Sequence, residues 1–237
     1  HAAYLLDSAS IKSFCQAAQS VLQPKDASVT PQKLSEFSQN IGQQLGWHLV
    51  DHNVSERQNF SRFSFQYKNT DASEIAINVM VIGKIIRILH ITVSKQQRPE
   101  AFTAVSGNCN VLETRQITYD DNGTPIAVLM MPTERAIITR PLNPPALPRP
   151  AEEKPANNLI VGHIDSGIDY RRADFANFLI YRDKNSFKGR DFWDDDYLPY
   201  DTDTARNPFF PQSHGSHVLD ILKQTGANFR LLPVRYP

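Results

Sequence analysis

The chain has 237 residues, enough for one large domain or two smaller ones, and its 41% hydrophobic content is sufficient to build buried cores. Its 25 basic and 25 acidic residues cancel, so global charge gives no reason to expect binding to nucleic acid or to an anionic membrane. The most apolar stretch, residues 75–93, is interrupted by polar and charged residues. We therefore expect no membrane-spanning helix.

The sequence begins His-Ala-Ala-Tyr instead of Met and an export signal, which favours a processed protein that is secreted or periplasmic. Cys15 and Cys109 are too far apart for a CxxC redox or metal motif. They form either one disulfide or two buried thiols.

Two amphipathic helices are predicted first. Residues 8–22 carry apolar side chains at helical spacing. Residues 30–45 form the second helix, with Thr30 as the N-cap, Pro31 at the first helical position and Gly46 at the end.

Strands follow these helices, indicated by alternating apolar residues and by many β-branched and aromatic side chains. The predicted strands are residues 47–54, 60–68, 74–82, 84–93, 112–120 and 125–131. Asn122-Gly123 predicts a hairpin between the last two. We expect residues 1–140 to be an α+β domain with helices on one face of an antiparallel sheet.

Residues 141–158 contain six prolines in eighteen positions and almost nothing to bury, which is typical of an extended linker. Beyond it, residues 159–164 form a short apolar run of the kind found in buried parallel strands. A helix is predicted to begin near Gly215, and residues 229–234 form a last strand. This order predicts a βαβ fragment, so we expect residues 159–237 to be a partial α/β domain.

Asp165 follows the first of these strands directly, where open α/β sheets place functional groups. The segments LIVGHIDSGIDYRRADF, GRDFWDDDYLPYD, SHGSHVLDIL and NFRLLPVRYP, in this order, resemble blocks of the subtilisin-like serine peptidases (subtilases). The resemblance covers about residues 158–237. It implies the amino-terminal part of a subtilisin-like parallel-sheet catalytic domain, preceded by a prodomain-like or accessory module.

The resemblance assigns Asp165 as the triad aspartate and His214 as the general base. The supporting residues that it implies are Ser166, Gly167, Gly215, Ser216 and His217. Physical chemistry agrees, because a serine hydroxyl needs an imidazole to take its proton, and the imidazole needs a carboxylate to fix its tautomer. We expect a carboxylate oxygen of Asp165 roughly 2.6 to 3.2 Å from a ring nitrogen of His214. The alternative is that Asp165 caps a turn and His214 caps a helix.

Two features depart from the family pattern. Leu219 and Asp220 stand where the family has two small residues, and residues 218–237 contain no serine. Ser216 is a poor substitute because it points away from the His214 side chain. The nucleophile is therefore expected from downstream sequence or from a second chain, and a partner is expected to cover the open sheet edge.

The predicted function is thus a subtilisin-like serine endopeptidase that acts on protein or peptide substrates and is inactive as residues 1–237 alone. The alternative is a catalytically inactive pseudoprotease or protein-binding module. A weaker alternative is a metal hydrolase using His163, Asp165, His214 and His217.

No cofactor is predicted, with calcium as the alternative. Asp194, Asp195 and Asp196 are weak candidate calcium ligands, although a solvated acidic loop is the favoured interpretation.

Overall fold

The computed structural model describes residues 5–23, 29–133, 136–146, 149 and 159–236. The chain divides into two compact units, His1–Thr118 with Val128–Arg140, and Tyr119–Ala127 with Pro141–Pro237. Most of the predicted linker lies outside the described residues. No helix in the described part is long and apolar enough to cross a membrane.

Two helices of the first unit have the predicted bounds, α1 (Ser8–Leu22) and α2 (Pro31–Leu45). The carboxylate of Asp7 caps α1 by accepting a backbone hydrogen bond, and the hydroxyl of Thr30 does the same for α2. Gly46 ends α2 in the left-handed conformation, with φ of 71°.

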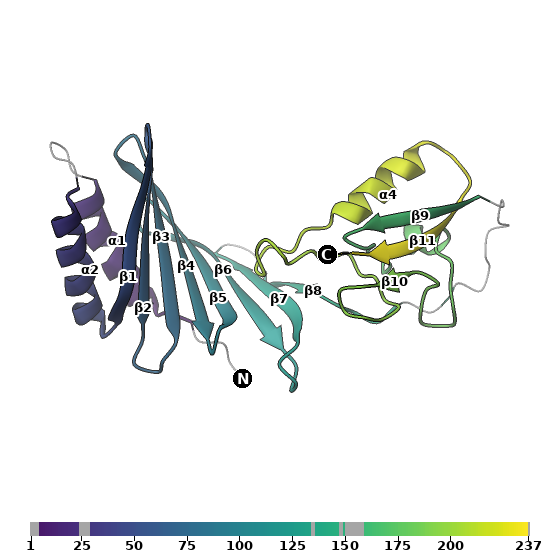
Figure 1. The fold of residues 1–237 in the computed structure, drawn as a ribbon, viewed down its shortest axis with the longest axis horizontal. Helices are drawn as coiled ribbons and strands as arrows, with labels where there is room; N and C mark the ends of the chain where they lie inside the picture. The colour runs from purple at the N-terminus through teal and green to yellow at the C-terminus, as the bar shows by residue number, and fades with distance from the viewer. Residues whose placement is uncertain (1–4, 24–28, 134–135, 147–148, 150–158, 237) are drawn as a thin grey trace. The chain divides into compact units, whose positions relative to one another are not determined.

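An eight-stranded antiparallel sheet follows, with its strands in chain order (Figure 1). The strands are β1 (His48–Arg57), β2 (Phe60–Lys68), β3 (Glu74–Ile82), β4 (Ile85–Lys95), β5 (Arg98–Ser106), β6 (Val111–Tyr119), β7 (Pro125–Pro132) and β8 (Ile138–Pro141). In β3 every second residue from Ile75 to Val81 is buried, which is the alternation seen in the sequence.

The core of the first unit lies between the helices and one face of the sheet. Phe14 of α1 and Phe37 of α2 contact each other and Phe65 of β2 edge to face, with ring centroids 5.5 to 5.7 Å apart. Aromatic packing therefore fixes both helices on the sheet.

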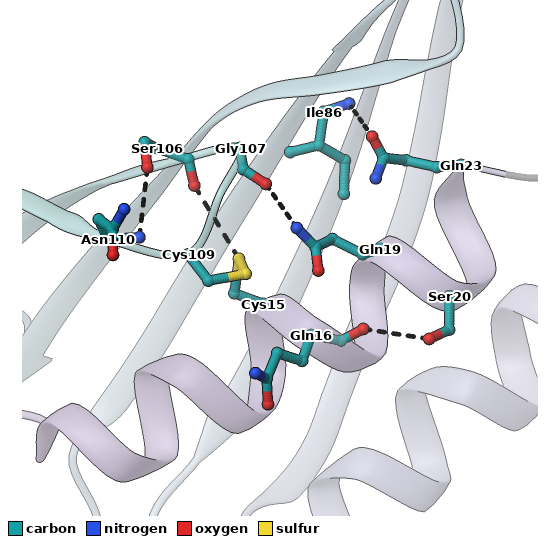
Figure 2. Close-up of a disulfide and its surroundings, with 10 residues drawn as sticks. All are labelled: Cys15, Gln16, Gln19, Ser20, Gln23, Ile86, Ser106, Gly107, Cys109 and Asn110. Atoms are coloured by element: carbon teal, nitrogen blue, oxygen red, sulfur yellow. Dashed lines mark hydrogen bonds between the residues drawn. A yellow bond between two sulfur atoms is a disulfide. The ribbon is translucent and has the colours of Figure 1, made fainter.

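A disulfide between Cys15 and Cys109 ties α1 to the turn after β5 (Figure 2). The two Cα atoms are 5.6 Å apart, and 94 positions separate the residues in sequence. One helical turn further on, the side-chain amide of Gln19 donates a hydrogen bond of 2.6 Å to the carbonyl of Gly107 (Figure 2). Of the two alternatives for these cysteines, one disulfide or two buried thiols, the structure has the disulfide.

In the second unit, the described residues 159–236 form three short strands and two helices. They are β9 (Ile160–Asp165), α3 (Ala173–Ala176), β10 (Arg190–Asp191), α4 (His214–Gln224) and β11 (Arg230–Arg235). The strands form a parallel sheet in the order β10-β11-β9, which leaves β9 at an edge. The described apolar core of this unit includes Leu219 of α4 and Leu231 of β11, so α4 packs on the sheet.

The predicted fold class is wrong. We expected an α+β domain followed by a partial α/β subtilisin-like domain, whereas the structure is mostly one antiparallel sheet of eight strands, with few helices and a parallel sheet of only three strands. Strand β5 was not predicted because Pro99, Glu100 and two alanines disfavour a strand, and pairing with β4 and β6 overrides that preference. Residues 166–213 contain only the four-residue α3 as helix, since their Asp, Asn and Pro residues favour turns.

Candidate functional site

Asp165 is the last residue of β9, and the chain turns sharply after it. Gly167 makes this turn with φ of 106°, and a Cβ atom there would lie 2.6 Å from the carbonyl oxygen of Tyr200. Only glycine fits this backbone without strain. The turn therefore fixes where the Asp165 carboxylate lies relative to the loop that contains Tyr200.

His214 is the first residue of α4, and its ring meets the Asp165 carboxylate. The distances from Nδ1 of His214 to the two carboxylate oxygens are 2.8 and 3.0 Å. The Asp165 side chain is 18% exposed and the His214 side chain is 70% exposed. The structure thus brings together the two residues that the sequence paired, within the expected distance.

The pKa values of the pair shift in the directions expected for such a contact. The hydrogen bond that the ring donates to the Asp165 carboxylate, together with the charge of that carboxylate, raises the pKa of His214 above its usual value. Burial alone would raise the pKa of Asp165, but hydrogen bonds from His214 and from the Ser166 backbone N–H outweigh it and lower that pKa. Asp165 is therefore the charged partner, and its carboxylate favours the protonated form of His214.

Both recorded hydrogen bonds of the His214 ring use Nδ1, so Nε2 has no partner within the described part of the chain. His214 borders a cleft with a volume of about 460 Å³. The residues that line it are Asp165, Ser166, Trp193, Asp203, Ala205, Arg206, Gln212, His214, Arg235 and Tyr236. An imidazole that is held at Nδ1 and open at Nε2 can accept a proton from a group that enters this cleft.

Four of the five predicted supporting residues lie around the start of α4. The Ser166 hydroxyl accepts a hydrogen bond of 3.0 Å from the backbone N–H of Gly215. Gly215 packs so closely that a Cβ atom there would lie 2.0 Å from the carbonyl oxygen of Gly167. Ser216 is buried, and its hydroxyl accepts a hydrogen bond of 2.8 Å from the N–H of Asp169, so it does not face His214.

His217, the fifth of these residues, is exposed on α4. Within the described part of the chain, its side chain forms no hydrogen bond or ion pair with Asp165 or His214. No group of three or more His, Cys, Asp or Glu side chains in the described residues is arranged to hold a metal ion. The four residues of the metal-hydrolase alternative therefore do not form a ligand set here.

The candidate calcium ligands are used in other contacts. Asp194 accepts a hydrogen bond of 2.7 Å from the guanidinium of Arg235, and Asp195 pairs with Arg190. Asp196 accepts the backbone N–H of Leu198. Arginine side chains therefore neutralise the carboxylates of Asp194 and Asp195, two of the three candidate calcium ligands.

Two charged residues near the site, Arg235 and Asp201, have contacts there that were not predicted from the sequence. Arg235 is 3% exposed and donates to Asp191, Asp194 and the carbonyl of Thr202. The sequence could have indicated this role, because Arg235 falls at one of the alternate positions of β11 whose side chains are buried. A buried basic side chain needs an acidic partner. Asp201 is 2% exposed, and no local pattern distinguishes it from its acidic neighbours.

Comparison of the chain with protein-family models, with curated proteins and with solved structures found no match.

Proposed function

We propose that this chain supplies the aspartate and the general base of a subtilisin-like serine endopeptidase, and that the nucleophilic serine comes from outside residues 1–237. The observation that carries the proposal is the hydrogen bond of 2.8 Å between Nδ1 of His214 and Asp165, made by a histidine that lines a cleft. The resemblance of the sequence blocks around both residues supports it further.

In the proposed reaction, Nε2 of His214 takes the serine hydroxyl proton while the serine oxygen attacks the carbonyl carbon of the scissile peptide bond. The imidazolium then donates that proton to the leaving amine, and water repeats the cycle to release the acyl group. Asp165 stays ionised throughout, because its role is to hold the imidazole tautomer and to stabilise the imidazolium.

Strand β9 offers a surface for the segment that carries the serine. It is the edge of the parallel sheet, and its side chains Ile160 and Ile164 are 61% and 73% exposed. A strand that pairs with this edge would run alongside β9 as far as Asp165, and it would extend the sheet face on which Ile160 and Ile164 lie. Unpaired edges and exposed apolar residues are features that proteins cover with a partner.

The disulfide of the first unit supports an oxidising compartment, and a secreted or periplasmic location is part of the proposal.

The test is peptide cleavage and labelling by a fluorophosphonate probe with the complete protein that carries the serine. His214→Ala should abolish turnover, and Asp165→Asn should reduce it by roughly 10⁴ through the wrong imidazole tautomer. His217→Ala is the matched control, since this histidine is exposed on the same helix and should not be needed for the reaction. Full turnover after His214→Ala would rule out the proposed base.

A catalytically inactive binding module is the second candidate. It is favoured because no hydroxyl group of the described residues forms a hydrogen bond with Nε2 of His214. In that case His214→Ala and Asp165→Asn should change partner affinity no more than surface substitutions do, about 0.5 kcal/mol.

A further inference from the structure

Helix α4 begins with His214 but lacks the usual side-chain cap. The N-cap residue, Ser213, makes no capping hydrogen bond with its side chain. The first N–H groups of a helix have no partner within the helix, so they need acceptors from elsewhere. The N–H groups of Gly215 and Ser216 find them in residues distant in sequence.

The acceptors are the hydroxyl of Ser166 and the carboxylate of Asp201. One carboxylate oxygen of Asp201 accepts the Ser216 N–H at 2.7 Å, and the other accepts the Ser166 hydroxyl at 2.6 Å. The Ser166 oxygen in turn accepts the Gly215 N–H at 3.0 Å. These three hydrogen bonds form a closed link between the residue after Asp165 and the two residues after His214.

Asp201 is itself held firmly. It is 2% exposed, and its backbone N–H donates to the carbonyl of Ile168 at 3.2 Å. The next residue, Thr202, accepts a hydrogen bond of 2.6 Å from the buried guanidinium of Arg235. A buried carboxylate that accepts two hydrogen bonds in a fixed loop is a rigid anchor.

We propose that Asp201 is the positioning residue of the site, which holds the start of α4 against the end of β9 and thereby keeps the His214 ring on Asp165. Its negative charge at the amino-terminal end of α4 also interacts favourably with the helix dipole. The contacts of Asp201 with Ser166 and Ser216 support this positioning role directly. Its consequence for catalysis rests on the proposed function.

The groups whose charges act on the His214 ring come from several elements. Asp165 and His163 lie on β9 and Asp201 on the loop before α4, while Asp203, Arg206 and Arg235 line the same cleft. A change at Asp201 must therefore be compared with a change at an acidic residue of the same unit that does not line the cleft. Asp183 is the matched control, because its carboxylate accepts hydrogen bonds from the neighbouring Asn185 N–H and Ser186 hydroxyl.

The first experiment uses residues 1–237 and follows the His214 ring by NMR, through its titration and its low-field Nδ1 proton. Asp201→Asn keeps the side-chain shape but removes the charge and leaves an amide N–H opposite one of the two donors. We expect a lower His214 pKa, because a nearby negative charge and the ordered Asp165 contact are both lost, and a weaker low-field proton signal. Asp183→Asn should leave the low-field signal in place.

Ser166→Ala is the second variant, in case Asp201→Asn fails to fold. It removes the hydrogen bond to Gly215 but keeps the one from Ser216 to Asp201, so it should weaken the same signal to a smaller extent. An unchanged low-field signal and titration in whichever of these variants folds would overturn the inference.

The second experiment separates this inference from the proposed function. In the complete protease, Asp201→Asn should lower kcat roughly 10- to 100-fold with little change in KM, and should move the acidic limb of the pH profile to lower pH. If the complete protein has no peptidase activity but Asp201→Asn still disturbs His214 in the NMR experiment, the positioning role stands and the proposed function falls. An active protease whose kcat is indifferent to Asp201→Asn would refute the positioning role alone.

Discussion

The histidine two residues before Asp165 lies in a very different environment from His214. His163 is 5% exposed on β9, and its Nε2 has no hydrogen-bond partner among the described residues. Burial lowers its pKa, despite the nearby charge of Asp165. The neutral imidazole of His163 is therefore buried on β9, while the protonatable imidazole of His214 lines the cleft.

This difference predicts a pH effect on stability. In the unfolded chain His163 binds a proton below about pH 6.5, whereas in the folded chain it resists protonation. The contribution of His163 to stability should therefore fall as the pH drops below that value, by up to about 1.4 kcal/mol per pH unit, whereas the raised pKa of His214 contributes with the opposite sign. His163→Val should remove the loss from His163, so that the change in the free energy of unfolding from pH 7 to pH 5, measured by urea denaturation, is less destabilising in the variant than in the wild type.

The control is His217→Val, which changes an exposed histidine of the same unit. This variant should keep the pH dependence of the wild type. If His163→Val has the same pH dependence as His217→Val, His163 is not the residue responsible.

At the scale of elements, the turn that ends β9 is the tightest constraint on the site. Gly167→Ala would place a Cβ atom 2.6 Å from a backbone carbonyl at a φ of 106°. We expect a loss of at least about 2 kcal/mol in the free energy of unfolding and a displaced Asp165–His214 contact, measured by denaturation and by the His214 NMR titration. Gly162→Ala, in the strand that precedes this turn, is the control, because nothing lies within 4 Å of its added Cβ. Equal effects of the two substitutions would contradict this account.

The disulfide makes a prediction for the first unit. Replacing both Cys15 and Cys109 with serine should lower the free energy of unfolding by about 2 to 4 kcal/mol, because the crosslink closes a long loop in the unfolded chain. The chain has two tryptophans, Trp47 in the first unit and Trp193 in the second. In a Trp193→Phe background, the fluorescence of Trp47 therefore reports this unit alone.

A reducing agent is the control for this experiment. It should shift the unfolding midpoint of the parent protein and leave that of the double-serine variant where it is. A parent protein that is indifferent to reduction would show that the crosslink contributes nothing.

Elements with a strong local signal were predictable from the sequence. Thr30-Pro31 marks the start of α2 and Gly46 its end, and both were found in place because caps act within one turn. Strand β5 and the contacts of Asp201 and Arg235 were missed, because they depend on neighbours far away in the sequence. The pairing of Asp165 with His214 was expected from the resemblance of the two sequence blocks to those of the subtilisin-like peptidases, whereas the contacts of Asp201 between them were not.

For the whole molecule, the absence of net charge bears on how a serine-bearing segment would assemble with this chain. With 25 basic and 25 acidic residues there is no overall field to attract a partner. The exposed side chains of β9 beside Asp165 are apolar instead. Assembly should therefore be driven by burial of apolar surface and depend little on salt.

The prediction is that residues 1–237 alone show no peptide cleavage and no labelling by a fluorophosphonate probe, and gain both when the serine-bearing segment is added. Ile164→Glu should weaken this assembly tenfold or more, since burying one isoleucine side chain contributes about 1.5 to 3 kcal/mol. Ile85→Glu is the matched control, because Ile85 is an exposed isoleucine of the first unit. The dissociation constant is measured by titration calorimetry at 0.05 M and 0.5 M salt, concentrations roughly either side of the physiological value. A strong salt dependence, or equal weakening by the two substitutions, would show that the segment does not dock on β9.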